Sequence, residues 1–153
     1  MTIWWDDLRI GTVLELGSRS VDAAEIIEFA RRYDPQPFHL DESAAAQSSF
    51  GGLVASGVHT FGIFTALAAG AFFTRIANLG GTGITDMRWL VPVRPGDTLS
   101  ARAEILSQTR PSASKPDRGV LVLRAELANQ CDELVWHATV TSLVRRRPAA
   151  AGG

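Results

Sequence analysis

The sequence is poor in cysteine, with Cys131 as its single thiol in 153 residues. One thiol cannot form an internal disulfide, so we expect a protein of a reducing compartment, the cytoplasm. The three histidines, at positions 39, 59 and 137, also lack the spacing to cysteines or acids that metal sites show. We therefore expect no metal ion and no other cofactor.

An excess of charge of one sign is missing too. The chain has 15 Lys and Arg against 16 Asp and Glu, and its formal net charge is -1. The only basic run, Arg145–Arg147, is typical of a solvated terminus. Because the charges balance and this basic run is short, nucleic acid is not expected as a partner. Residues 1–7 lack the basic flank and apolar stretch of a secretory signal, in keeping with the expected cytoplasmic location.

A hydrophobic run long enough to cross a membrane is absent as well. Residues 57–73 are seventeen residues without Asp, Glu, Lys or Arg. This falls just short of the about 20 residues of a spanning helix, and the run contains His59, Thr60 and Thr65. The pattern predicts a helix buried on all sides in a globular protein, with no membrane as partner. His59 is expected either in a cleft or, preferably, in the core.

What the sequence does contain predicts one domain over residues 1–148, followed by a flexible tail at 149–153. Asp22 and Glu25 have the spacing of a capping box, and the helix that they begin should end before Pro35. Alternation of apolar and polar residues predicts strands elsewhere. These predicted strands are residues 10–16, 84–91, 98–107, 119–128 and 133–144.

Helices followed by consecutive strands indicate an α+β fold, with a curled antiparallel sheet packed on the buried helix. One sheet cannot cover such a helix on all sides. We therefore expect a second copy to complete the structure as a homodimer, with a higher homo-oligomer as an open alternative.

The segment Tyr33–His39 is the most informative for chemistry. It places one carboxylate, Asp34, and one imidazole, His39, in a stretch that Pro35 and Pro37 make rigid. Such a segment suits a preorganised site, although an Asp-Pro pair also commonly opens a turn and a lone histidine is often a core residue.

A second segment, Phe50–Gly57, contains several glycines and leads directly into the buried helix. The first N–H groups of a helix are unpaired and carry partial positive charge, so they suit a developing oxyanion. Ser56 and Gly57 also read as a simple helix N-cap. The two interpretations are compatible, since a capped helix end still presents N–H groups to a ligand.

The hexapeptide Asp34-Pro-Gln-Pro-Phe-His39 resembles the Asp-x-Asn-Pro-x-His signature of the MaoC-like dehydratase or (R)-specific enoyl-CoA hydratase family. The segment to Gly57 and the turn at residues 94–97 resemble the same family, over about residues 5–145 of the chain. The resemblance implies a hot-dog fold, in which a curled antiparallel sheet wraps a long central helix.

The resemblance also implies roles for individual residues. Asp34 and His39 would hold and activate a water, and the Gly57 N–H would polarise the thioester carbonyl. Thr65, inside the helix, would help to orient the pair. The sequence departs from the family pattern at Gln36, where Asn is usual, and at Ser56, where many members have His; both positions bear on how the site is oriented.

The implied function is hydration of a trans-2-enoyl-CoA to the (R)-3-hydroxyacyl-CoA, or the reverse, with an acyl-CoA as substrate partner. In hydration His39 would take a proton from water and Asp34 would return a proton to C2. The coenzyme A phosphates need basic partners, for which Arg88, Arg94, Arg110 and Lys115 are available.

Two other functions remain open. A hot-dog thioesterase commonly uses a carboxylate on the central helix, and the predicted helix here has no Asp or Glu. A non-catalytic acyl-CoA-binding module would keep the fold without turnover, although the Asp34 and His39 pair argues against it.

Overall fold

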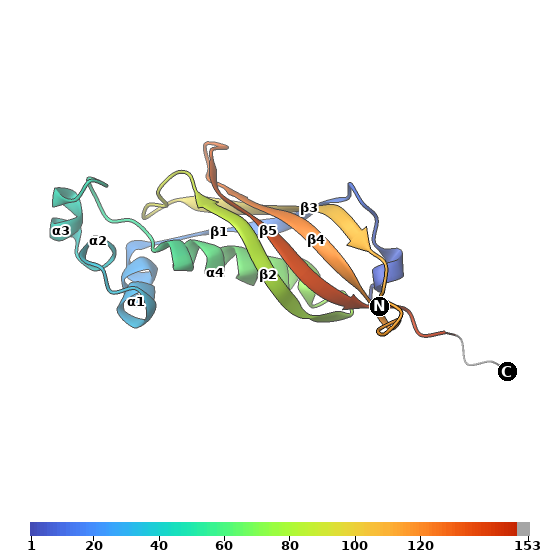
Figure 1. The fold of residues 1–153 in the computed structure, drawn as a ribbon. Helices are drawn as coiled ribbons and strands as arrows, with labels where there is room; N and C mark the ends of the chain where they lie inside the picture. The colour runs from blue at the N-terminus through green and yellow to red at the C-terminus, as the bar shows by residue number, and fades with distance from the viewer. Residues whose placement is uncertain (150–153) are drawn as a thin grey trace.

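The computed structural model describes residues 1–149 (Figure 1), so most of the predicted tail, residues 150–153, lies outside the described residues. Within that range the strands form one five-stranded antiparallel sheet in the order β1-β3-β4-β5-β2. The strands are β1 (Val13–Ser20), β2 (Asn78–Trp89), β3 (Thr98–Thr109), β4 (Arg118–Ala128) and β5 (Leu134–Arg145). The helices are α1 (Ala23–Tyr33), α2 (Pro37–Leu40), α3 (Glu42–Gln47) and α4 (Gly57–Ala68), with a π-helical turn at Ala69–Phe73 and a 3-10 turn at Trp5–Asp7.

The core lies between this sheet and α4, which runs along one face of the sheet (Figure 1). Alternate residues of β4 are buried, among them Leu121, Leu123 and Leu127, as period-two patterning requires. Trp136 of β5 is fully buried, and its ring centroid lies 5.1 Å from that of Phe64 in α4. The predicted α+β fold, a curled antiparallel sheet around one helix, is confirmed.

Helix α4 is not buried on all sides within one copy of the chain. His59, Ile63 and Phe64 are buried, whereas Val58 is 53% exposed and Thr65 is also exposed. The core position preferred for His59 is therefore confirmed, and the burial expected around the whole helix is not reached by a single chain. In residues 1–149, no helix has the length and apolar character that crossing a membrane requires.

The first two strands differ from their predicted bounds. The strand predicted at 10–16 is shifted to Val13–Ser20, because Gly11 takes a turn conformation with φ +84° and a bulge at Gly17 lets β1 continue along β3. The strand predicted at 84–91 already begins at Asn78. Its pairing with β5 overrides the weak strand propensity of the glycines in β2.

Helices α1, α2 and α3, which precede α4, form a group beyond one end of the sheet (Figure 1). Asp22 caps α1, since its side chain accepts the Glu25 N–H at 2.8 Å. The other half of the predicted capping box is absent, because the Glu25 side chain contacts Arg19 and His59 instead. Pro35 follows the last residues of α1, as predicted, and α2 and α3 were not predicted.

The N-terminal turn and the segment that follows β5 meet at the opposite end of the sheet. Arg146 donates to Asp6 at 2.7 Å and its guanidinium lies 5.7 Å from the ring centroid of Trp5. Arg147 donates to Asp7, also at 2.7 Å. The basic run is at least partly exposed, as predicted for a solvated terminus, and Arg146 and Arg147 also pair with two acids of the N-terminal turn, over a hundred residues away in sequence.

Candidate active site

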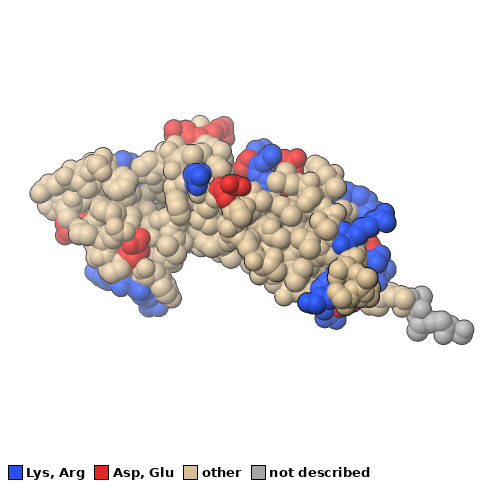
Figure 2. All heavy atoms as spheres, viewed as in Figure 1, with Lys and Arg blue, Asp and Glu red and all other residues tan. Residues whose placement is uncertain are grey.

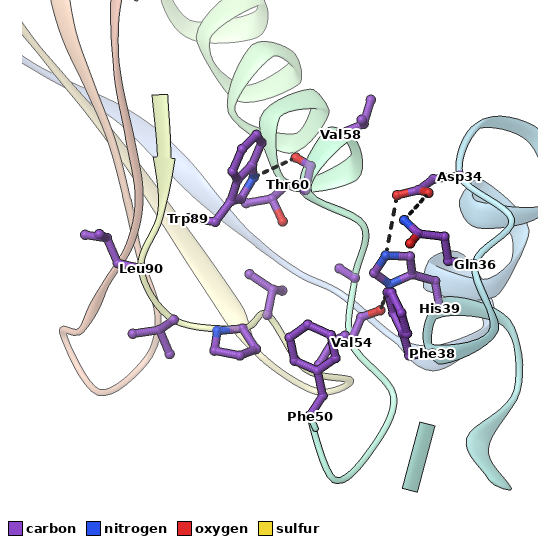
Figure 3. Close-up of a pocket in the computed structure, with 15 residues that line it drawn as sticks. Asp34, Gln36, Phe38, His39, Phe50, Val54, Val58, Thr60, Trp89 and Leu90 are labelled. Atoms are coloured by element: carbon purple, nitrogen blue, oxygen red, sulfur yellow. Dashed lines mark hydrogen bonds and ion pairs between the residues drawn. The ribbon is translucent and has the colours of Figure 1, made fainter. Parts of the chain in front are cut away.

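A cavity of about 560 Å³ lies where the start of α4 meets α1, α2 and the end of β2 (Figure 3). Asp34, His39 and Gly57 line it together with apolar side chains such as Phe50 and Trp89. The predicted candidate residues from two separate segments of the sequence thus share one cavity.

Asp34 is placed by the end of helix α1. Its backbone N–H makes the last helical hydrogen bond, to Ala30 O at 2.9 Å, and Pro35 prevents the helix from continuing. The side chain therefore projects from a rigid helix end, where little conformational freedom remains to be lost when a substrate binds.

Both carboxylate oxygens of Asp34 accept side-chain hydrogen bonds. Ser56 Oγ donates to Oδ2 at 2.6 Å, and Gln36 Nε2 donates to Oδ1 at 2.7 Å. The Ser56 hydrogen bond is the main reason that the pKa of Asp34 lies below its ordinary value of 3.8, and Gln36 adds to it against the opposing effect of burial. Asp34 is therefore a carboxylate, and not a carboxylic acid, at neutral pH.

His39 is placed by α2, which begins at Pro37, and it is buried. Its Nδ1 lies 2.6 Å from Val54 O, an acceptor, so this nitrogen carries the ring proton of the neutral imidazole. In this neutral form Nε2 has a free lone pair, and it lies 3.4 Å from Asp34 Oδ2 (Figure 3). Two acceptors face one another at this distance, so one water molecule could donate a hydrogen bond to each.

Gly57 opens helix α4 beside this pair. Ser56 Oγ accepts the Val58 N–H at 3.2 Å, while the Gly57 N–H has no acceptor among residues 1–149. Trp89 crosses the helix start, and its Nε1 donates to Gly57 O at 3.0 Å. A Cβ at position 57 would lie 2.6 Å from Trp89 Cε2, so this contact requires glycine. The free N–H, at the positive end of a helix, can stabilise an oxyanion.

Thr65 is the one candidate residue that neither lines this cavity nor hydrogen-bonds to Asp34, as the buried Ser56 does. It lies on an exposed part of α4 and its hydroxyl donates to Phe61 O at 3.1 Å. Its side chain lines a different cavity of about 610 Å³ between α4 and β2. In a single chain, Thr65 therefore cannot orient Asp34 or His39.

Trp89 is a residue of the cavity that the sequence analysis missed. It pairs with Trp136 of β5 just after a bulge in β2, where Asp86 has φ +52°. Such bulges commonly re-aim side chains beside active sites. No local pattern in the sequence signals a contact between residues 89 and 57.

Among the four proposed phosphate-binding cations, Arg94 has a side chain that hydrogen-bonds to a lining residue of this cavity. Its Nη2 donates to Phe50 O at 2.6 Å, which leaves the guanidinium at the rim. Residues 1–149 contain no group of three or more His, Cys, Asp and Glu side chains arranged to hold a metal ion.

Comparison with known proteins places this site in a family. The family model described as MaoC like domain matches residues 8–120, more than half of the chain. The chain belongs to the MaoC-like family. Its curled sheet around a central helix is the hot-dog fold.

Two of the relatives of this MaoC-like protein match it over nearly all of its length. A crystal structure of the MaoC-like dehydratase from Rhodospirillum rubrum is 39% identical, with a TM-score of 0.87, and the match covers 96% of this chain and 99% of that one. YdeM of Bacillus subtilis is 30% identical over 92% of this chain and 98% of its own. The 3-hydroxybutyryl-CoA dehydratase of Methylorubrum extorquens is 29% identical over 67% of this chain and 64% of its own.

Proposed function

We propose that this MaoC-like protein is a hydro-lyase that adds water to a trans-2-enoyl-CoA to give the (R)-3-hydroxyacyl-CoA, or catalyses the reverse. The main observation is that one cavity holds the Asp34 carboxylate, the His39 imidazole with its Nε2 facing that carboxylate, and a helix N–H without an acceptor among residues 1–149. The name of the Methylorubrum extorquens relative supports the reaction class. The (R) configuration is the one that the family resemblance implies.

The first step of the proposal activates a water between Asp34 and His39. The water donates hydrogen bonds to Asp34 Oδ2 and to His39 Nε2, and Nε2 takes a proton as the oxygen bonds to C3 of the enoyl thioester. Asp34 stays ionised, in keeping with its low pKa, so it orients the water and stabilises the imidazolium that forms.

The electron pair of the C2–C3 double bond moves toward the thioester oxygen, where negative charge develops. The free Gly57 N–H donates to this oxyanion; loss of one such donor typically costs about 3 kcal/mol of barrier, or roughly a hundredfold in rate. We expected Asp34 to return a proton to C2. Its low pKa favours His39 for this step instead, so the proton on Nε2 passes to C2 and restores the thioester.

The test follows the enoyl-thioester absorbance of crotonyl-CoA with wild type, Asp34→Asn and His39→Ala. We expect both substitutions to lower the rate by at least about a hundredfold, the lower end of the contributions that general acid–base groups make. The matched control is Asp41→Asn, since Asp41 also caps a nearby helix, accepting the Ala44 N–H at 2.7 Å, but lies outside the cavity.

Three outcomes separate the hypotheses. Wild-type turnover that Asp34→Asn and His39→Ala abolish, with Asp41→Asn active, supports the hydro-lyase. Release of free coenzyme A from acyl-CoA would indicate a thioesterase. If no short, long, branched or dicarboxylic enoyl-CoA is turned over but acyl-CoA binds, the protein is a binding module and the proposal fails.

The proposed reaction uses only Asp34, His39, the Gly57 N–H and water, and coenzyme A enters as part of the substrate. Protein dialysed against a strong chelator should therefore keep its full rate. A lost rate that returns on adding back a metal ion would contradict this part of the proposal.

We further propose that the working unit is a homodimer. The outer edge of β2 has no strand partner in residues 1–149, and Ile84 and Trp89 on it are 39% and 54% exposed. An apolar cavity lies between β2 and α4. Val58, elsewhere on α4, is also exposed. Figure 2 shows the face of the molecule that includes β2, and few charged side chains lie over the middle of this face. A second copy is the occupant that would pair this edge and cover this helix.

Analytical ultracentrifugation of wild type and Ile84→Lys tests the dimer. We expect twice the chain mass for wild type and a shift toward monomer for the variant. Arg124→Glu, on the central strand β4, changes charge away from that edge and serves as the control. A wild type that sediments as a monomer at micromolar concentration would overturn the proposal.

A further inference from the structure

The first turn of helix α4 contains a histidine, His59, that the proposed reaction does not use. His59 lies on the opposite face of the helix from Gly57 and is only 3% exposed. Its Nε2 lies 3.1 Å from Glu25 Oε1 on α1, and its ring stacks on Phe29 at 4.5 Å between centroids.

The protonation of His59 follows from its burial. Desolvation is the main reason that its pKa lies below the usual 6.5, so the ring is neutral at neutral pH. A neutral ring can donate to a carboxylate only through its one N–H, which is therefore on Nε2. Nδ1 is left as a buried acceptor without a hydrogen-bond partner among residues 1–149.

Packing alone does not account for a histidine at position 59. An unpaired buried nitrogen is unfavourable, and an apolar ring would stack on Phe29 without it. The hydrogen bond from Nε2 to Glu25 is what His59 supplies and an apolar residue could not.

The surroundings of this hydrogen bond indicate that it holds helices α1 and α4 together. A cavity of about 520 Å³ lies between α1 and α4, lined in part by Phe29 and Gly62, so apolar packing between the two helices is incomplete. Glu25 is itself fixed from β1, since Arg19 Nη2 donates to its Oε1 at 2.7 Å. The Glu25 carboxylate therefore has a defined position, from which it holds the first turn of α4.

We propose that Glu25 and His59 are positioning residues that set the distance between Asp34 and the Gly57 N–H; this rests on the proposed function. Helix α1 carries Glu25 near its start and Asp34 at its end. It is attached to the start of α4 at both places, by Glu25 to His59 and by Asp34 to Ser56 at 2.6 Å. With polar contacts at both ends, α1 has less freedom to pivot on α4 than it would have with such a contact only through Asp34.

The variants separate the hydrogen bond from charge and from ring packing. Glu25→Ala removes the acceptor, and His59→Phe keeps a ring on Phe29 but removes the donor. Both should lower kcat by about tenfold to a hundredfold, the effect of displacing a reacting group by about 1 Å, with KM changed less than about threefold. Glu25→Gln keeps an oxygen acceptor and should restore kcat to within about threefold of wild type.

The control is Glu28→Ala on the same helix. Glu28 lines the same cavity, but within residues 1–149 its ion-pair partner is the exposed Arg32, at 3.4 Å. It should leave kcat unchanged. The double variant Glu25→Ala with His59→Phe should be no slower than the slower single variant, because both remove one interaction.

Three results would overturn the proposal: unchanged kcat in Glu25→Ala, an equal loss in Glu28→Ala, or a Glu25→Gln variant as slow as Glu25→Ala. A lowered melting temperature with normal kcat would likewise show a role in stability alone. Since Glu25 is partly exposed at the surface, its variants should fold even if His59→Phe does not.

A readout without turnover separates this proposal from the proposed function. The chain has only three histidines, so imidazole NMR signals are few and assignable. Displacement of Asp34 should shift the ring signals of His39 in Glu25→Ala and not in Glu28→Ala. If the wild type is inactive but His39 shifts in this way, the positioning contact stands and the hydro-lyase proposal fails; if His39 does not shift, the positioning contact is refuted whatever the activity.

Discussion

Replacement of Ser56 by alanine tests how the site holds its carboxylate. The Ser56 side chain is fully buried and makes two contacts at once: its Oγ caps α4 by accepting the Val58 N–H, and it donates to Asp34 Oδ2 at 2.6 Å. Loss of an N-cap costs about 1 kcal/mol. Loss of a hydrogen bond to a charged group costs about 1.5–3 kcal/mol, of which we take the lower end because Asp34 is partly exposed. Ser56→Ala should therefore lower the unfolding free energy by about 2.5 kcal/mol.

The matched control is Ser48→Ala. Ser48 Oγ also makes two hydrogen bonds, to Ala45 O at 2.6 Å and from the Phe50 N–H at 3.2 Å, but neither partner is charged. We expect a loss of about 1 kcal/mol in urea unfolding. In enoyl-CoA hydration Ser56→Ala should lower kcat by about tenfold, because Asp34 gains freedom to turn away from His39, and Ser48→Ala should not. Equal stability losses in the two variants, or full activity in Ser56→Ala, would refute the reasoning.

The pH dependence of the Ser56→Ala effect has a definite sign. Asp34 has a folded-state pKa below 3.8, so its ionised form stabilises the fold fully above that value. This stability is lost as pH falls through the lower folded-state pKa. Because Ser56 is the main cause of the shift, the stability difference between wild type and Ser56→Ala should be constant near neutral pH and shrink below about pH 4.

Three further predictions concern other parts of the structure. Gly57→Ala places a Cβ 2.6 Å from the Trp89 ring and should cost about 1–3 kcal/mol in urea unfolding, together with most of the activity. His59 binds a proton less readily when folded, so wild-type stability should fall as pH drops below 6.5, and His59→Phe should flatten this fall in melts between pH 7 and 5. Arg146→Gln breaks the pair with Asp6 and should cost at most about 1 kcal/mol, leaving kcat unchanged because the pair lies far from the site.

The parts of the site that the sequence predicted are the ones fixed by local chain geometry. Asp34 and His39 belong to one segment in which Pro35 ends a helix and Pro37 begins the next, so neighbouring residues determine where both side chains point. Gly57 could be predicted because a helix start always leaves N–H groups unpaired. None of these placements depends on a distant strand.

The parts that the sequence did not predict depend on distant pairing. Trp89 reaches Gly57 only because a bulge in β2 and the left-handed Asp86 turn the strand end toward α4. The contact of Glu25 with His59 likewise joins two helices that the sequence pattern describes separately. The early start of β2 has the same cause, since pairing with β5 outweighs what its glycines favour.

The two departures from the family signature have one common consequence in the structure. Gln36 and Ser56 were the positions at which the sequence differed from the usual Asn and His, and their side chains are the two that donate to Asp34, one to each carboxylate oxygen. The longer side chain of Gln36 can fold back two residues to reach Oδ1, and the short Ser56 can cap α4 while it reaches Oδ2. Because both donors stabilise the charged form, Asp34 is ionised and fixed before any substrate binds. In the proposed reaction His39 Nε2 is then the group of the pair that carries the proton, so the two departures bear on which of the two residues transfers it.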